Sequence, residues 1–104
     1  MINEYLKAKR NPLKPYRPVP QIACVDGFKI SVQASSFTYC QPREDNAPQY
    51  TEVECGFPSA VPEFILEYAE NPDDPTETVY GYVPIELVEQ LITLHGGIAA
   101  GEVK

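Results

Sequence analysis

The chain has 104 residues, carries a formal charge of −7 and is 43% hydrophobic. This length fits one domain with one modest core, and the composition excludes wholesale disorder. No apolar run approaches the roughly 20 residues of a membrane-spanning helix, and the first residues lack the apolar core of a signal peptide. Three cysteines without paired spacing favour a reducing compartment. We therefore expect a soluble, cytoplasmic protein.

The charge is unevenly distributed along the chain. Five of the eight basic residues fall within the first 17 positions, whereas residues 18–104 hold three basic and 14 acidic residues, a net charge of −11. Such a body repels nucleic acid and anionic membranes and is attracted to basic surfaces. We expect no direct nucleic-acid or membrane partner, and a protein partner with a basic surface. Solubility alone is the simpler explanation of the acidic excess.

Residues 1–20 are predicted to form a basic, proline-rich arm, followed by a single domain over residues 21–104. A short basic helix is compatible with Met1–Arg10, but four prolines between residues 12 and 20 stop it and favour an extended path. The proline spacing matches PxxP-binding grooves, although a linker or an arm lying on its own acidic body is the simpler interpretation. The basic side chains of the arm are Lys9, Arg10, Lys14 and Arg17.

The body begins with a predicted β-hairpin. Ile22–Val25 and Phe28–Val32 flank an Asp-Gly pair at positions 26 and 27, which is among the strongest short hairpin signals. Strand character resumes over Phe37–Cys40, and Tyr50–Phe57 alternates as the next antiparallel strand. These segments predict a meander of three or four strands.

The next segment is ambiguous. Apolar spacing and the stop at Asn71-Pro72 favour a short helix over Pro62–Ala69. Alternation of Phe64, Leu66 and Tyr68 leaves open an additional strand that would pair with Thr78–Val83.

The last third of the chain reads as a strand followed by a helix. Thr78–Val83 is rich in β-branched and aromatic residues, with Tyr80 and Tyr82 expected on one face. Gly81 leaves room for close approach, most simply by the following helix. The helix Pro84–His95 has a wide apolar sector, so it is buried between layers or shares its flank with a partner, which leaves a homodimer open.

We therefore expect an α+β domain: an antiparallel sheet of three to four strands packed by a C-terminal helix, with a second short helix. Nothing in the sequence resembles a nucleotide-binding loop, and a lone histidine excludes a two-histidine metal motif. Buried, inert thiols are the expected state of Cys24, Cys40 and Cys55, and backbone carbonyls the expected partners of His95. We expect no cofactor, no metal, no catalytic residue and no enzymatic activity.

The tyrosines suggest a binding surface instead. Seven tyrosines supply contact area with a polar group, which binding surfaces use heavily, and the same residues also suit a small core. The predicted partner-binding face, acidic and aromatic, consists of Tyr39, Tyr50, Tyr80, Tyr82, Glu44, Asp45, Glu52, Glu54, Asp73, Asp74 and Glu77.

Three segments, SVQASSFTYCQPR (31–43), VECGFPS (53–59) and VYGYVPIELVEQLITLHGGI (79–98), resemble those of small uncharacterised bacteriophage proteins. The resemblance spans most of residues 28–98 and carries over no functional residue. It implies a phage accessory protein, acting in the host cytoplasm. Small acidic α+β proteins of that kind often occlude a host factor, as anti-defence proteins such as anti-CRISPRs do.

The leading hypothesis is thus a non-enzymatic inhibitor or modulator of a host protein with a basic surface. One alternative is a structural or virion assembly subunit whose arm reaches a neighbouring copy. The other is a small-molecule binding or sequestering protein built around Gly81, the tyrosines and His95.

Overall fold

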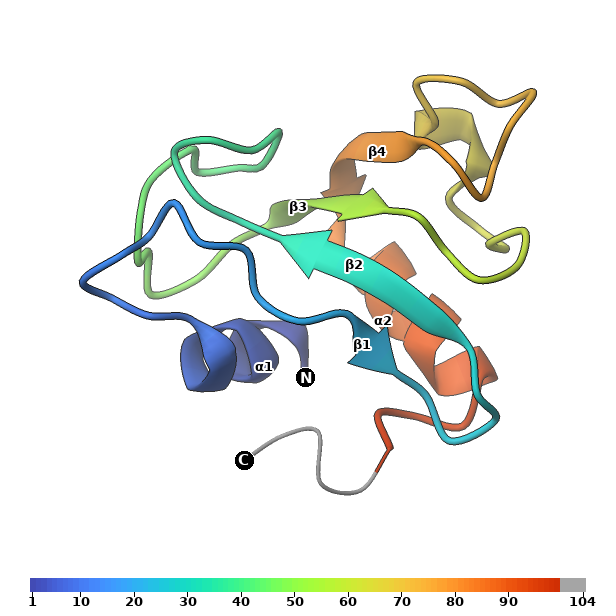
Figure 1. Ribbon diagram of the computed structural model, residues 1–104, viewed down its shortest axis with the longest axis horizontal. Helices are drawn as coiled ribbons and strands as arrows, with labels where there is room; N and C mark the ends of the chain where they lie inside the picture. The colour runs from blue at the N-terminus through green and yellow to red at the C-terminus, as the bar shows by residue number, and fades with distance from the viewer. Residues whose placement is uncertain (100–104) are drawn as a thin grey trace.

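The computed structural model describes residues 1–99 and shows an antiparallel sheet with two α-helices (Figure 1). The elements in chain order are α1 (Ile2–Lys9), β1 (Ile22–Ala23), β2 (Lys29–Gln33), β3 (Glu52–Gly56), a 3-10 turn η1 (Leu66–Tyr68), β4 (Val79–Pro84) and α2 (Ile85–Leu94). The predicted α+β class, the antiparallel meander and the C-terminal helix are confirmed. No helix within residues 1–99 is long and apolar enough to cross a membrane.

The four strands follow one another in the sheet in the order β1-β2-β3-β4. The predicted hairpin forms, with Ile22 opposite Ile30, and its turn is closed by a 2.9 Å hydrogen bond from the Phe28 N–H to the Asp26 carboxylate. Both sheet edges are partly covered: Ala99 donates to the Ala23 carbonyl, and Glu70 donates to the Val79 carbonyl. Covered edges disfavour pairing with strands of other chains.

A β-bulge in β4 breaks the predicted alternation of its side chains. Val53 pairs with Val83 and Cys55 with Tyr80, so Gly81 and Tyr82 together oppose Glu54. The extra residue lets Tyr80 and Val83 both reach the core, while Tyr82, at φ +52°, stays exposed. The expectation that Tyr80 and Tyr82 share one face was therefore wrong.

The core lies between the sheet and the two helices. α2 buries Val88, Leu91 and Ile92, and α1 packs beside α2 (Figure 1). The wide apolar sector of α2 is thus largely buried within the domain. Among the leucines of this helix, Leu94 alone is mostly exposed.

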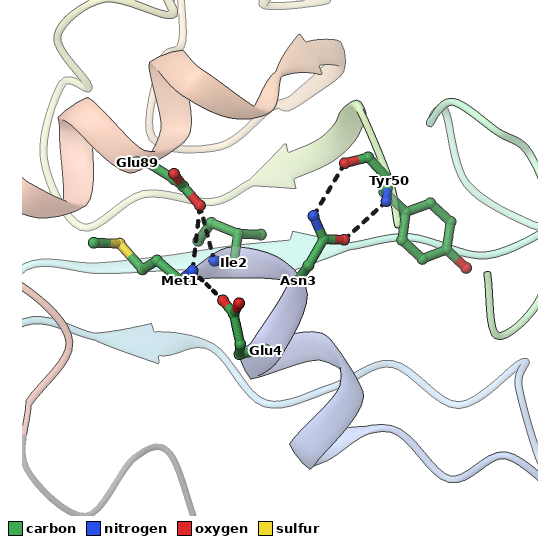
Figure 2. A network of polar contacts seen from close by, with 6 residues as sticks. All are labelled: Met1, Ile2, Asn3, Glu4, Tyr50 and Glu89. Atoms are coloured by element: carbon green, nitrogen blue, oxygen red, sulfur yellow. Dashed lines mark hydrogen bonds and ion pairs between the residues drawn. The ribbon is translucent and has the colours of Figure 1, made fainter. Parts of the chain in front are cut away.

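The helix predicted within Met1–Arg10 forms, and it belongs to the core of the domain. Its buried side chains are Ile2, Tyr5 and Leu6. Figure 2 shows how its start is held: Glu89 of α2 accepts from the Ile2 N–H at 3.1 Å, and Asn3 makes two hydrogen bonds with the backbone of Tyr50. The Met1 amino group pairs with Glu4 and lies 3.5 Å from Glu89, and these carboxylates, Glu4 foremost, raise its pKa.

Residues 11–20 lie on the body, and residues 11–17 form turns where an extended path was expected. Two successive turns are closed by hydrogen bonds from Lys14 to the Asn11 carbonyl and from Arg17 to the Lys14 carbonyl. The Gln33 side chain then binds both the N–H and the carbonyl of Val19, each at 2.8 Å. The proline segment is therefore fixed to β2.

Two predicted elements are absent from their expected places. Phe37–Cys40 is a loop, because Ser35 and Thr38 side chains satisfy its backbone locally in turns. Pro62–Ala69 contains only the η1 turn, since Phe64 at φ +73° interrupts any helix. The alternative strand is reduced to one isolated bridge between Ala69 and Tyr80.

Candidate functional site

The face of the sheet opposite the helices carries a pair of exposed tyrosines. Tyr39 and Tyr82 have ring centroids 5.8 Å apart at a 40° tilt, with 41% and 44% of their surfaces exposed. Their backbones are fixed, because the Tyr82 N–H donates to the Tyr39 carbonyl at 3.0 Å and the Tyr39 N–H donates to Glu54 at 3.1 Å. The loop at residues 35–40 is thereby laid over the bulge of β4.

Gly81 makes this arrangement possible. A Cβ at position 81 would lie 3.3 Å from Cβ of Tyr39, closer than ordinary contacts. The group that approaches Gly81 is therefore the Tyr39 side chain, and the expectation that α2 would do so was wrong.

The charges around this Tyr39–Tyr82 pair are mixed. Glu52 and Glu54 alternate on β3 with the buried Val53 and Cys55, so both carboxylates lie on the tyrosine face. The Arg43 guanidinium lies 5.5 Å from the centre of the Tyr39 ring, within the range of a cation–π contact.

Tyr50 and Tyr80, predicted on the partner-binding face, are core residues. Their hydroxyls donate to the carbonyls of Glu44 (2.6 Å) and Pro75 (2.5 Å), and burial raises the pKa of both phenols. Tyr5 likewise donates to the Pro20 carbonyl. Each buried tyrosine thus connects a proline-containing loop to the core. The sequence had left open whether the tyrosines form a binding surface or fill the core, and these three belong to the core.

The predicted acidic residues do not form one surface. Asp45 accepts from both the N–H and the hydroxyl of Ser36, and Glu44 is exposed in the same loop. The loop between η1 and β4 holds Asp73, Asp74 and Glu77. It lies at the upper right of Figure 1, whereas the loop before β3 lies at the upper left. Of the predicted face, the structure brings together Tyr39, Tyr82, Glu52 and Glu54.

The basic residues of the first 20 positions fall into different environments. Lys9 lies 5.9 Å from the Tyr5 ring centre, and Lys14 is exposed in a turn. Arg10 donates to the Ala47 carbonyl at 3.2 Å. Arg10 and Arg17 both line a groove of about 200 Å³ that sequence reasoning missed, because its walls come from segments distant in sequence.

His95 and the cysteines occupy structural positions. His95 Nδ1 lies 2.7 Å from the Asp26 carboxylate and its ring stacks on Phe28 at 4.0 Å, so its main polar partner is a carboxylate and not a carbonyl. All three thiols are buried and unpaired, and burial raises the pKa of Cys24 to about 11. Within residues 1–99, no three His, Cys, Asp or Glu side chains gather as metal ligands would.

Comparisons with protein-family models, with curated proteins and with solved structures found no match to this chain.

Proposed function

We propose that this chain is a non-enzymatic binding protein of the cytoplasm, which contacts a basic surface of a partner protein through the Tyr39–Tyr82 pair and the neighbouring Glu52 and Glu54. The observation that carries the proposal is the pair itself. Two large rings lie exposed on the face of the sheet that α1 and α2 leave open, and hydrogen bonds of their backbone N–H groups fix the segments that carry them. Aromatic side chains held in this way lose little entropy on binding and dominate many interfaces.

The neighbouring charges favour a cationic partner group. Arg43 already places its guanidinium over one face of the Tyr39 ring, and Tyr82 has no such cation within residues 1–99. An arginine of a partner could stack on the Tyr82 ring while Glu52 and Glu54 supply charge-assisted hydrogen bonds. The net charge of −7 adds attraction at long range. For a phage accessory protein, such a partner is a host protein whose basic surface becomes covered.

The test is a titration of the full chain with an arginine-rich peptide, in which the NMR shifts of backbone amides and aromatic rings are monitored. We expect shifts at Gly81, Tyr82 and Tyr39, and affinity that falls as salt is added. The double variant Tyr39→Ser/Tyr82→Ser should weaken binding about tenfold or more, the range for aromatic anchors.

Phe64→Ser is the matched control, because Phe64 is 48% exposed, is also aromatic and lies outside the tyrosine face. It should leave the affinity unchanged. Peptide binding that survives the double tyrosine change, or that shifts other residues only, would contradict the proposal.

A further inference from the structure

A second surface lies beside the tyrosine face and has different chemistry. The groove runs between the proline segment at residues 15–19 and the loop at residues 34–38, with Gln33 and Glu54 also in its lining. Tyr16 and Phe37 contribute exposed aromatic rings, and α1 contributes Leu6 and Arg10.

Hydrogen bonds hold the backbone of both walls of this groove. Gln33 holds Val19 through two hydrogen bonds, and Asn46 donates to the Pro12 carbonyl at 3.0 Å. On the opposite wall, the Ser35 N–H donates to the Thr38 hydroxyl and Cys40 donates to the Ser35 carbonyl. Preformed walls lower the entropic cost of binding.

The groove has unused cationic donors. The Arg17 side chain makes no hydrogen bond or ion pair within residues 1–99, and Arg10 uses only Nη1, on the Ala47 carbonyl. Guanidinium forks match the oxygens of carboxylates and phosphates. The one acidic side chain in the lining is Glu54, and its Oε1 already accepts from Tyr39.

We propose that this groove binds a small aromatic anion, meaning one flat ring that carries a carboxylate or a phosphate. Arg17 and Arg10 bind the anionic group, and Tyr16, Phe37 and the prolines contact the ring. The volume of about 200 Å³ lies below the roughly 300 Å³ at which pockets for larger ligands begin, so it suits a single ring. This site adjoins the tyrosine face and shares Glu54 with it, but it does not depend on the function proposed for that face.

The experiment titrates the full chain with phenyl phosphate, benzoate and inorganic phosphate at millimolar concentration and follows amide NMR shifts. We expect phenyl phosphate or benzoate to shift residues 16–19 and 33–38, and to bind several-fold more tightly than inorganic phosphate. Arg17→Gln should weaken binding about tenfold by removing a charge-assisted contact. Lys14→Gln is the matched control, because it removes the same charge from an exposed side chain outside the groove lining.

Glu54→Gln separates this proposal from the function proposed above. It removes the opposing charge in the groove and should tighten binding of the aromatic anion, whereas it should weaken binding of an arginine-rich peptide. The proposal is wrong if no aromatic anion binds, if inorganic phosphate binds as tightly as phenyl phosphate, or if Lys14→Gln lowers affinity as much as Arg17→Gln.

Discussion

Asp26 and His95, 69 residues apart, join the β1–β2 turn to the end of α2 through a 2.7 Å contact between Oδ2 and Nδ1. Backbone hydrogen bonds reinforce the junction, since Asp26 donates to the His95 carbonyl and Val25 donates to that of Gly97. The His95 ring stacks on Phe28, and Nε2 is buried 3.6 Å from a Glu63 oxygen without a hydrogen bond within residues 1–99. The hairpin and the helix end therefore form one structural unit.

In the Asp26→Asn variant, we expect the free energy of unfolding to fall less steeply as the pH is lowered. The Phe28 N–H, and then His95, lower the pKa of Asp26 below its ordinary value of 3.8. A carboxyl group with a lowered folded pKa stabilises the protein above its unfolded pKa, and this contribution is lost as pH falls through the folded value. Urea unfolding between pH 2 and 7 should show a shallower acid loss for the variant. Asp74→Asn, at an exposed acid, should retain the wild-type slope.

Much of this unit could be predicted from local sequence. The Asp-Gly turn specified the hairpin, and the proline followed by an apolar helical pattern specified the strand-to-helix passage from β4 to α2. Both signals are local, because turn chemistry and helix periodicity act over a few residues.

Other features required long-range information. The bulge at Gly81-Tyr82 depends on a pairing with Glu54, and the burial of α1 depends on α2 and on the backbone of Tyr50. The lysines and prolines near residues 7–20 predicted an arm, and the structure adds that three apolar residues of α1, Ile2, Tyr5 and Leu6, are buried. The Tyr39–Tyr82 pair likewise joins positions 43 residues apart, which no sequence spacing could bring together.

Tyr80→Phe should destabilise the domain by about 1 kcal/mol, because the Pro75 carbonyl loses the hydrogen bond from a buried phenol. The loop at residues 71–77 should also exchange its amide hydrogens faster. Tyr82→Phe is the control, since its hydroxyl has no partner within residues 1–99 and its ring is exposed. Equal stability of the two variants in chemical denaturation would show that the hydroxyl does not hold the loop.

Ile2→Ala should lower the free energy of unfolding by about 2 kcal/mol, the lower end for a buried aliphatic residue, because a terminal helix can adjust. Lys7→Ala, on the exposed side of the same helix, should change it by less than about 0.5 kcal/mol. Chemical denaturation measures both. An unaffected Ile2→Ala variant would indicate that α1 is a dispensable arm after all.

The three thiols should resist a thiol-specific reagent in the folded protein at pH 8. Burial raises the pKa of Cys24 to about 11 and that of Cys55 further, so the reactive thiolate is scarce and enclosed. Denaturation should release all three for labelling. Fast labelling of one thiol in the folded state would identify a reactive cysteine.

Gly81→Ala tests the link between the fold and the tyrosine face. The added Cβ would meet Cβ of Tyr39 at 3.3 Å, so the Tyr39 side chain would have to shift by a few tenths of an ångström. We therefore expect a stability loss of only about 1 kcal/mol, together with altered ring shifts of Tyr39 and Tyr82 in NMR spectra. Gly56→Ala in β3 is the control, because its Cβ would make an ordinary 3.5 Å contact with Val79. One outcome is that Gly81→Ala leaves the ring shifts of Tyr39 and Tyr82 unchanged and still lowers the affinity for an arginine-rich peptide. In that case the peptide recognises something other than the geometry of the pair. If the ring shifts and the peptide affinity change together, the peptide recognises the spacing of Tyr39 and Tyr82.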